Sequence, residues 1–96
     1  MSDYFDDEFE WDEAKSDSTF QRRGFDFFFA CRVFEDADYL EQFDEIHSDD
    51  EDRWKVMGWV EPLYLYVVYT QRGARRRILH ARHCEPGEID EYDRQF

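Results

Sequence analysis

The chain has 96 residues, a formal net charge of -13 and an aromatic content of 20%. A chain of this length forms one small hydrophobic core, which excludes a second domain of ordinary size. Ten Phe, six Tyr and three Trp are far more than a disordered acidic chain carries, so we expect a folded protein.

The start of the chain and its two cysteines indicate a cellular compartment. The opening MSDYFDDEFEW is acidic and lacks the basic start and the apolar run of a signal peptide. No stretch approaches the roughly 20 apolar residues of a membrane span. Cys31 and Cys84 are too few for a disulfide framework, so we expect free thiols and a cytoplasmic location.

Residues 1–8 are acidic and have no hydrophobic periodicity. We interpret them as a disordered tail whose removal leaves folding intact, followed by a single domain over residues 9–96.

The first part of this domain reads as a short strand and two helices. Residues 9–11 are strand-like, and Asp12 is a suitable N-cap for a helix over 13–23 that ends at Gly24. A second helix is predicted to begin near Asp26. Its apolar face consists of Phe27, Ala30, Val33 and Phe34.

The middle of the chain predicts two strands separated by an acidic loop. Residues 39–43 alternate as an edge strand does, and residues 53–60 alternate as well. The loop over 44–52 has six acidic residues in nine. Because it lacks the glycine and terminal glutamate of an EF-hand, we interpret it as a solvated loop rather than a calcium site.

The last part predicts a hairpin and a helix. Residues 63–71 are apolar on both faces, as in a central strand, and Gly73 turns the chain into a strand over 75–83. Pro86 then stands in the first turn of a final helix. The expected fold is α+β, with N-terminal helices and a C-terminal helix packed on one face of an antiparallel sheet whose other face is open.

The sequence lacks several familiar catalytic and cofactor motifs. It has no glycine-rich phosphate loop, no GxSxG and no paired CxxC. His80, His83 and Cys84 suggest zinc at first, but residues 80 and 83 of a strand point to opposite faces and no fourth ligand is evident. We therefore predict neither a metal nor a cofactor.

The positive charge is concentrated in one segment. Residues 62–84 contain no acidic residue but five of the twelve cationic ones, namely Arg72, Arg75, Arg76, Arg77 and Arg82. Such a segment binds a polyanion, or it pairs with acids of the chain itself or of a partner. The charge pattern alone leaves these readings open.

Strand and helix periodicity suggest which of these side chains meet. Alternation places Ile78, His80 and Arg82 on one face, and the other face then carries Arg77, Leu79, Ala81 and His83. In the final helix Glu88 and Tyr92 share a face. If that helix packs beside the last strand, these two groups and the guanidinium groups converge on a site that could handle a phosphodiester. In the structural alternative Glu88 is an ion-pair partner and Tyr92 a core aromatic residue.

Taken in order, these segments resemble the BrnT family of type II toxins. The stretch FEWDEAKSDSTFQRRGFDFFFACRVFED resembles the start of that family, and RW, VVYTQRG and RILHAR follow in its order, with the late pair Glu88 and Tyr92. The resemblance covers roughly residues 9–92. It implies a small RelE-like domain that cleaves messenger RNA without metal. It also implies a BrnA-like ribbon-helix-helix antitoxin, which forms a hetero-oligomer with the toxin and provides its only contact with DNA.

The resemblance also implies roles for individual residues. The arginines would stabilise the charge on phosphate oxygens, Glu88 would be the base, and Tyr92 would position the phosphate or aid proton transfer. The candidate catalytic residues are Arg53, Arg77, Arg82, Glu88 and Tyr92; further candidates are Lys15 and His80, and RNA-binding residues are Arg72, Arg75 and Arg76. His80 would act as an acid because imidazole titrates near neutral pH.

Four features differ from the family pattern, and the first is His80, which stands where family members usually carry Ser. Thr19 replaces an Asn, Arg22-Arg23-Gly24 replaces a Lys-His-Gly sequence, and the last helix is acidic where the family has a basic one. An acidic helix repels RNA. The alternative function is therefore a catalytically inactive BrnT-like module that binds a protein partner through an acidic recognition surface.

Overall fold

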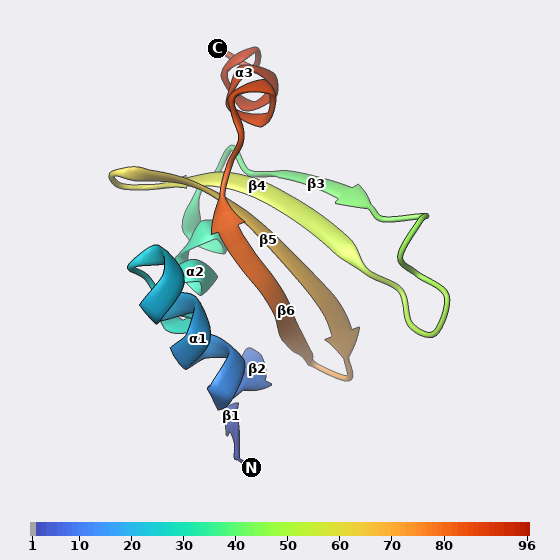
Figure 1. Cartoon of the computed structure of the whole chain (residues 1–96). Helices are drawn as coiled ribbons and strands as arrows, with labels where there is room; N and C mark the ends of the chain where they lie inside the picture. The colour runs from blue at the N-terminus through green and yellow to red at the C-terminus, as the bar shows by residue number, and fades with distance from the viewer. Residues whose placement is uncertain (1) are drawn as a thin grey trace.

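The computed structural model describes residues 2–96, and Met1 lies outside the described residues. In this part of the chain six strands form one sheet in the order β1-β2-β6-β5-β4-β3, and the helices surround it (Figure 1). The elements are β1 Asp3–Phe5, β2 Phe9–Asp12, α1 Glu13–Arg23, α2 Phe27–Ala30, the 3-10 helix η1 Cys31–Glu35, β3 Leu40–Phe43, β4 Trp54–Val60, β5 Leu63–Arg72, β6 Arg75–His83 and α3 Pro86–Asp93. The predicted α+β class is confirmed.

The sheet is mixed rather than wholly antiparallel. Four neighbouring pairs run antiparallel, but β2 runs parallel to β6, with Trp11 opposite Ile78. Local alternation cannot reveal this pairing, because the two strands are far apart in the sequence.

The segment 39–43 was predicted to be an edge strand, and β3 does lie at an edge of the sheet.

The N-terminal segment differs from the predicted structureless tail. Asp3–Phe5 forms β1, an edge strand that pairs antiparallel with β2. The Tyr4 ring stacks on Trp11 with 4.2 Å between ring centroids. Trp11 is only 4% exposed, so this segment covers part of the core.

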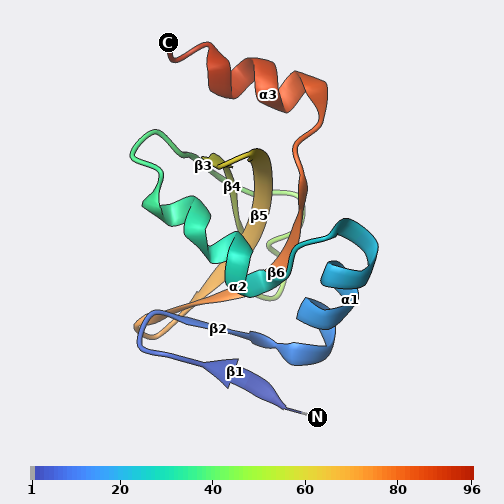
Figure 2. The same ribbon diagram turned by 90° about the vertical axis from the view of Figure 1, so that its left-hand side faces the viewer.

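Helix α1 begins and ends where its capping residues predict. The Asp12 carboxylate accepts a hydrogen bond from the Ala14 backbone N–H at 2.9 Å, and Gly24 adopts a φ of 84° that favours glycine. Its buried Ser16 hydroxyl accepts a hydrogen bond from the Phe27 backbone N–H, which joins α1 to α2. Figure 2 shows α1 beside β6, with α2 and η1 on the other side of that strand.

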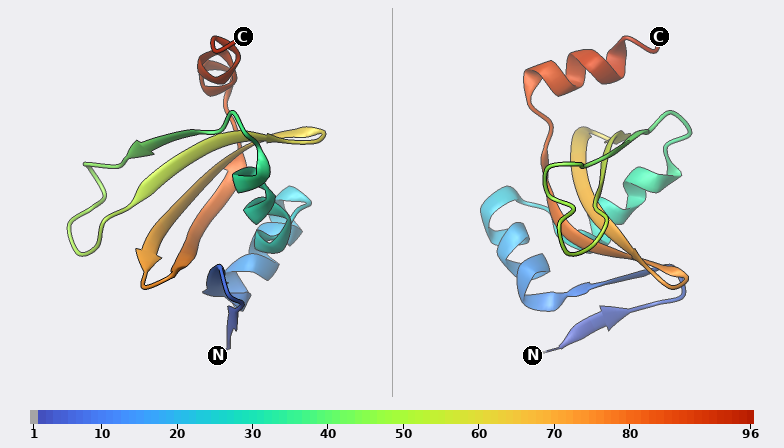
Figure 3. Two further views of the ribbon diagram at one scale, coloured as in Figure 1. Left: turned by 180° about the vertical axis from the view of Figure 1, so that it is seen from behind. Right: turned by 90° about the vertical axis from the view of Figure 1, so that its right-hand side faces the viewer.

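The second predicted helix is an α-helical turn that continues as the 3-10 helix η1. Phe27, Ala30 and Val33 are buried as predicted, each no more than 1% exposed. They pack on the face of the sheet that we call the core face, formed mainly by Val56, Leu65, Val67, Ile78 and Ala81 (Figure 3, left). Gly58 permits this approach, because a Cβ atom there would lie 2.6 Å from a methyl group of Val33.

A β-bulge changes the predicted faces of β6. Tyr69 of β5 pairs with Ile78 and Val68 pairs with His80, so Leu79 is an extra residue without a partner on β5. Ile78 therefore shares the core face with Ala81 and His83. The other face, which we call the open face, carries Arg77, His80 and Arg82 from β6. The prediction that His80 lies on the face opposite Arg77 is wrong.

Helix α3 lies beyond the end of β6 and contacts β4 (Figure 1; Figure 3). Together with α1 it borders the open face. No helix within residues 2–96 has the length and apolar character needed to cross a membrane.

Candidate functional site

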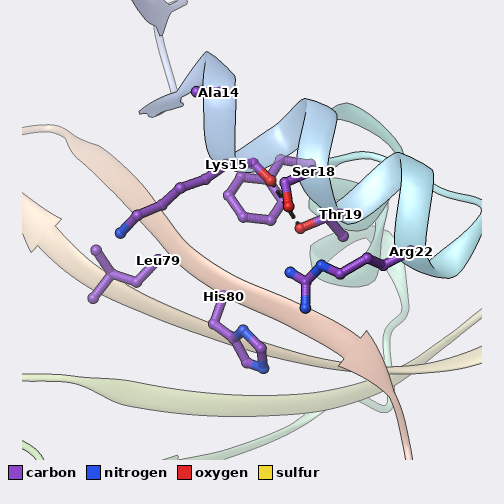
Figure 4. Close-up of a pocket in the computed structure, with 8 residues that line it drawn as sticks. Ala14, Lys15, Ser18, Thr19, Arg22, Leu79 and His80 are labelled. Atoms are coloured by element: carbon purple, nitrogen blue, oxygen red, sulfur yellow. Dashed lines mark hydrogen bonds between the residues drawn. The ribbon is translucent and has the colours of Figure 1, made fainter.

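A pocket of about 430 Å³ lies between α1 and β6. We call it the His80 pocket, and its lining consists of Ala14, Lys15, Ser18, Thr19, Arg22, Phe27, Leu79 and His80. Figure 4 shows the Lys15 and Arg22 side chains reaching from α1 toward β6, where His80 and Leu79 lie. The β-bulge contributes to the pocket, because it turns both Leu79 and His80 toward this region.

The lining contains two cationic side chains and an imidazole but no carboxylate. This is unusual in a chain with 25 acidic and 12 cationic residues. Within residues 2–96, neither Lys15 nor Arg22 forms a salt bridge. The pocket therefore offers unneutralised positive charge to an anion.

The surroundings of His80 keep its imidazole neutral. Burial lowers the pKa of His80, and the positive charges of four neighbours lower it further; these are Arg23, Arg82, Arg22 and Lys15. A neutral imidazole can accept a proton. The same cations that disfavour imidazolium would stabilise negative charge on a bound group.

Arg22 lines the pocket, but the sequence analysis did not select it as a site residue. Lys15, Ser18 and Arg22 are spaced i, i+3 and i+7, which places them on one face of α1. This spacing was visible in the sequence. The missing information was that this face of α1 borders β6.

The structure brings Arg82 and Glu88 together as predicted, but in a closed ion pair. The guanidinium donates to both carboxylate oxygens, at 2.8 and 2.9 Å, and stacks 3.8 Å from the centre of the Tyr66 ring. One Glu88 oxygen also accepts from the Glu85 backbone N–H. The bond from Arg82 lowers the pKa of Glu88, so this carboxylate is ionised and already engaged at neutral pH.

Arg77 lies on the same open face, but among acids. Its guanidinium lies 2.8 Å from a Glu10 oxygen and 3.1 Å from an Asp3 oxygen. Glu10 comes from β2, which pairs with β6, and Asp3 comes from β1, which pairs with β2. The two carboxylates therefore neutralise a charge that the sequence analysis assigned to phosphate binding.

Tyr92 and Arg53 lie away from the His80 pocket. The Tyr92 side chain is buried, and its hydroxyl donates to the Asp36 carboxylate; burial and this bond raise the pKa of Tyr92. Tyr92 therefore joins α3 to the segment after η1. Arg53 precedes β4, and its backbone N–H donates to the Ser48 hydroxyl of the acidic loop.

The three arginines predicted to bind RNA do not form one surface. Arg72 pairs with Glu51, Arg75 donates to the Asp6 carbonyl, and Arg76 stacks on the Phe34 ring at 4.1 Å. Phe34 packs against the core. The cationic segment is thus divided among several local environments.

The two β6 histidines point to opposite faces, since His83 lies on the core face with its ring 5.2 Å from that of Phe25. Within residues 2–96, no three His, Cys, Asp or Glu side chains are grouped so as to hold a metal ion. The His80 pocket instead combines a neutral imidazole with lysine and arginine, a set suited to acid-base chemistry on an anionic substrate.

Comparison with known proteins agrees with this chemistry. Residues 11–88 match the family model described as the ribonuclease toxin BrnT of type II toxin-antitoxin systems. A search of curated proteins finds no match. The family model covers most of the chain, including α1, the β-bulge and the Arg82–Glu88 pair. The chain therefore belongs to the BrnT family of ribonuclease toxins of type II toxin-antitoxin systems.

Proposed function

We propose that this protein is a metal-independent endoribonuclease that cleaves messenger RNA at the His80 pocket. The observation that carries the proposal is the composition of this pocket: Lys15, Arg22 and His80 converge with no carboxylate among them in a chain of net charge -13. A phosphodiester is the anion on which a ribonuclease acts, and family membership supports RNA as the substrate.

Cleavage requires three tasks, which these side chains can share. His80 accepts the proton of the ribose 2′-hydroxyl, whose oxygen then attacks the adjacent phosphorus. Lys15 and Arg22 stabilise the charge that grows on the phosphorane oxygens. The bond from phosphorus to the 5′-oxygen breaks, and the Lys15 ammonium gives the departing oxygen its proton. The products are a 2′,3′-cyclic phosphate and a 5′-hydroxyl.

Arg82 contributes to this site without holding the phosphate itself. Its pairing with Glu88 engages both terminal nitrogens, while its charge still lowers the pKa of His80. Glu88 is therefore a positioning residue for Arg82 in this proposal, and His80 takes the role of base.

We infer that a BrnA-like ribbon-helix-helix antitoxin neutralises the protein and provides its contact with DNA. Membership of a type II toxin family supports an antitoxin partner. Co-expression with the product of a neighbouring short reading frame tests this. A co-purifying complex without ribonuclease activity is expected, whereas two proteins that separate during purification contradict the inference.

The inactive binding module remains the competing function. The observation that favours it is that the chain's own acids pair with both Arg77 and Arg82. Cleavage of RNA by the purified protein distinguishes the two functions.

The decisive assay uses a long single-stranded RNA in EDTA at low salt. The parent protein should cleave it, and should not cleave the 2′-deoxy analogue. His80→Ala should lower the rate by about 10²- to 10⁴-fold, the usual contribution of a general base. His47→Ala, in the exposed acidic loop, is the matched control and should cleave like the parent. Equal rates for the parent and His80→Ala would refute the proposed site.

A further inference from the structure

A second pocket, of about 440 Å³, lies on the open face below α3. We call it the Met57 pocket, and its lining consists of Leu40, Glu41, Gln42, Lys55, Met57, Tyr66, Glu88 and Glu91. Its volume falls in the range of small-molecule sites, roughly 300 to 1,000 Å³. Its lining residues come from strands β3, β4 and β5 and from α3.

Cross-strand pairing connects this pocket to the His80 pocket. One row of paired residues crosses the open face from His80 through Val68 and Lys55 to Gln42. The neighbouring row runs from Arg82 through Tyr66 and Met57 to Leu40. β4 lies two strand spacings from β6, about 10 Å. A nucleotide with its phosphate at His80 can therefore extend its base over Tyr66 toward Met57.

The floor of the Met57 pocket suits the flat surface of a base. Leu40, Met57 and Tyr66 provide apolar and aromatic contacts. The Arg82 guanidinium stacks on Tyr66 and is fixed by the two bonds to Glu88. Unpaired bases stack on aromatic rings and on guanidinium planes of this kind.

The rim of the pocket favours a base over a phosphate. The carboxylates of Glu88 and Glu91 repel phosphate oxygens but accept hydrogen bonds from base N–H groups. Glu88 is engaged by Arg82, and the Glu41 carboxylate points to the core face, where it accepts from the Tyr69 hydroxyl at 2.7 Å. Glu91 is exposed, and no hydrogen bond or salt bridge joins its carboxylate to another residue of the described chain, 2–96. Its two oxygens are available for a ligand.

We propose that the Met57 pocket is a guanine subsite that sets the cleavage specificity of this ribonuclease. Guanine presents two adjacent donors, N1–H and the 2-amino group, which match the two oxygens of Glu91. The Gln42 amide can donate to the guanine O6. Uracil presents one donor between two carbonyls, which the carboxylate rim repels. This inference rests on the proposed function. It also gives the acidic helix α3 a role in binding a base, although its negative charge opposes binding of the RNA phosphates.

Cleavage of defined oligonucleotides tests the specificity. The substrates are oligouridylates with guanosine, inosine, adenosine or uridine at one central position. We expect cleavage next to guanosine to exceed cleavage next to inosine or uridine by about tenfold or more in kcat/KM, as one good bidentate contact provides. Inosine isolates the contact, because it lacks only the 2-amino group.

Two variants of α3 attribute the preference to Glu91. Glu91→Gln should remove the preference for guanosine, so that cleavage next to guanosine falls to the level of cleavage next to inosine. Asp90→Asn makes the same chemical change one residue away, outside the pocket, and should retain the preference. Equal rates on all four substrates by the parent would overturn the guanine subsite while the proposed ribonuclease function stands.

A binding experiment decides the inference independently of cleavage. Guanosine 3′-monophosphate and inosine 3′-monophosphate are titrated into protein with ¹³C-labelled Leu and Met methyl groups. The guanosine compound should shift the Leu40 and Met57 resonances at lower concentration than the inosine compound, and this difference should vanish in Glu91→Gln. If no RNA is cleaved, the proposed function falls and this titration still decides the subsite. Unshifted Leu40 and Met57 resonances would overturn it.

Discussion

Strand β6 places Arg77 and His80 on the same face of the sheet in opposite surroundings. Near its start, Arg77 lies between Glu10 and Asp3. Near its end, His80 faces the cations of α1 in a pocket whose lining has no carboxylate. The difference arises from the neighbouring element, because β2 borders β6 up to Ile78 and α1 lies beside it farther on.

This comparison shows that a concentration of arginines in the sequence does not by itself locate an anion site. Five arginines fall between residues 62 and 84, yet Arg77 and Arg82 are paired with acids. The unpaired cations of the His80 pocket come from α1, outside that segment. The cationic site is therefore formed by residues distant in the sequence.

The largest effect is expected from removing both unpaired cations. Lys15→Ala with Arg22→Ala should lower the rate of RNA cleavage by about 10³-fold, since one electrostatic donor is commonly worth 10² or more. Arg72→Ala with Arg94→Ala changes the net charge equally, outside the pocket, and should stay within about twofold of the parent. An equal loss in both double variants would mean that overall charge, rather than the pocket, determines the rate.

At the start of β6, removing the Arg77 side chain should lower the stability of the fold. Arg77→Ala leaves Glu10, which is 7% exposed, without its cation. We expect the free energy of unfolding to fall by about 3 kcal/mol, as for a largely buried ion pair that loses one partner. Urea unfolding measures this loss. Adding Glu10→Gln should restore part of the stability, and a double variant no more stable than Arg77→Ala would contradict the pairing argument.

A smaller loss of stability is expected when β1 is removed. Deleting residues 1–8 uncovers Trp11 and removes Asp3 from Arg77. The free energy of unfolding should fall by about 2 kcal/mol, the scale for exposing one large aromatic side chain. Thermal unfolding of the truncated protein tests this. An unchanged midpoint would support the original interpretation of residues 1–8 as a dispensable tail.

The smallest expected effect is a shift in pH dependence. Because His80 must be neutral to act as a base and its pKa is lowered, kcat/KM should decline on the acid side only below the ordinary histidine value of about 6.5. Arg22→Ala removes a cation that disfavours imidazolium, so the pKa of His80 rises and the acid limb moves to higher pH. Arg72→Ala should leave the limb in place. A limb that stays fixed in Arg22→Ala would exclude His80 as the titrating base.

Local signals predicted much of the fold. The Asp12 and Gly24 caps set the bounds of α1, and the predicted strand over 75–83 coincides with β6. The parallel pairing of β2 with β6 and the bulge at Leu79 depend on partners remote in the sequence. Alternation alone could not locate the bulge, so it assigned His80 to the wrong face.

The site was predictable only in part, because it also depends on residues that are distant in the sequence. Lys15, His80 and Arg82 were candidates from the sequence, and the contact of Arg82 with Glu88 was anticipated. The roles of Arg77 and Tyr92 changed because their partners, Glu10 and Asp36, come from other elements. Charge pairing over such distances cannot be read from composition.

In the proposed mechanism an RNA phosphate binds at His80 and not at Arg77. NMR titration with a 2′-O-methyl oligonucleotide, which cannot be cleaved by this mechanism, measures both positions in one sample. The imidazole resonances of His80 should shift strongly, while the Nε–Hε resonance of Arg77 stays in place. A shifted Arg77 resonance beside an unchanged His80 would refute binding at His80 and locate the phosphate at the start of β6.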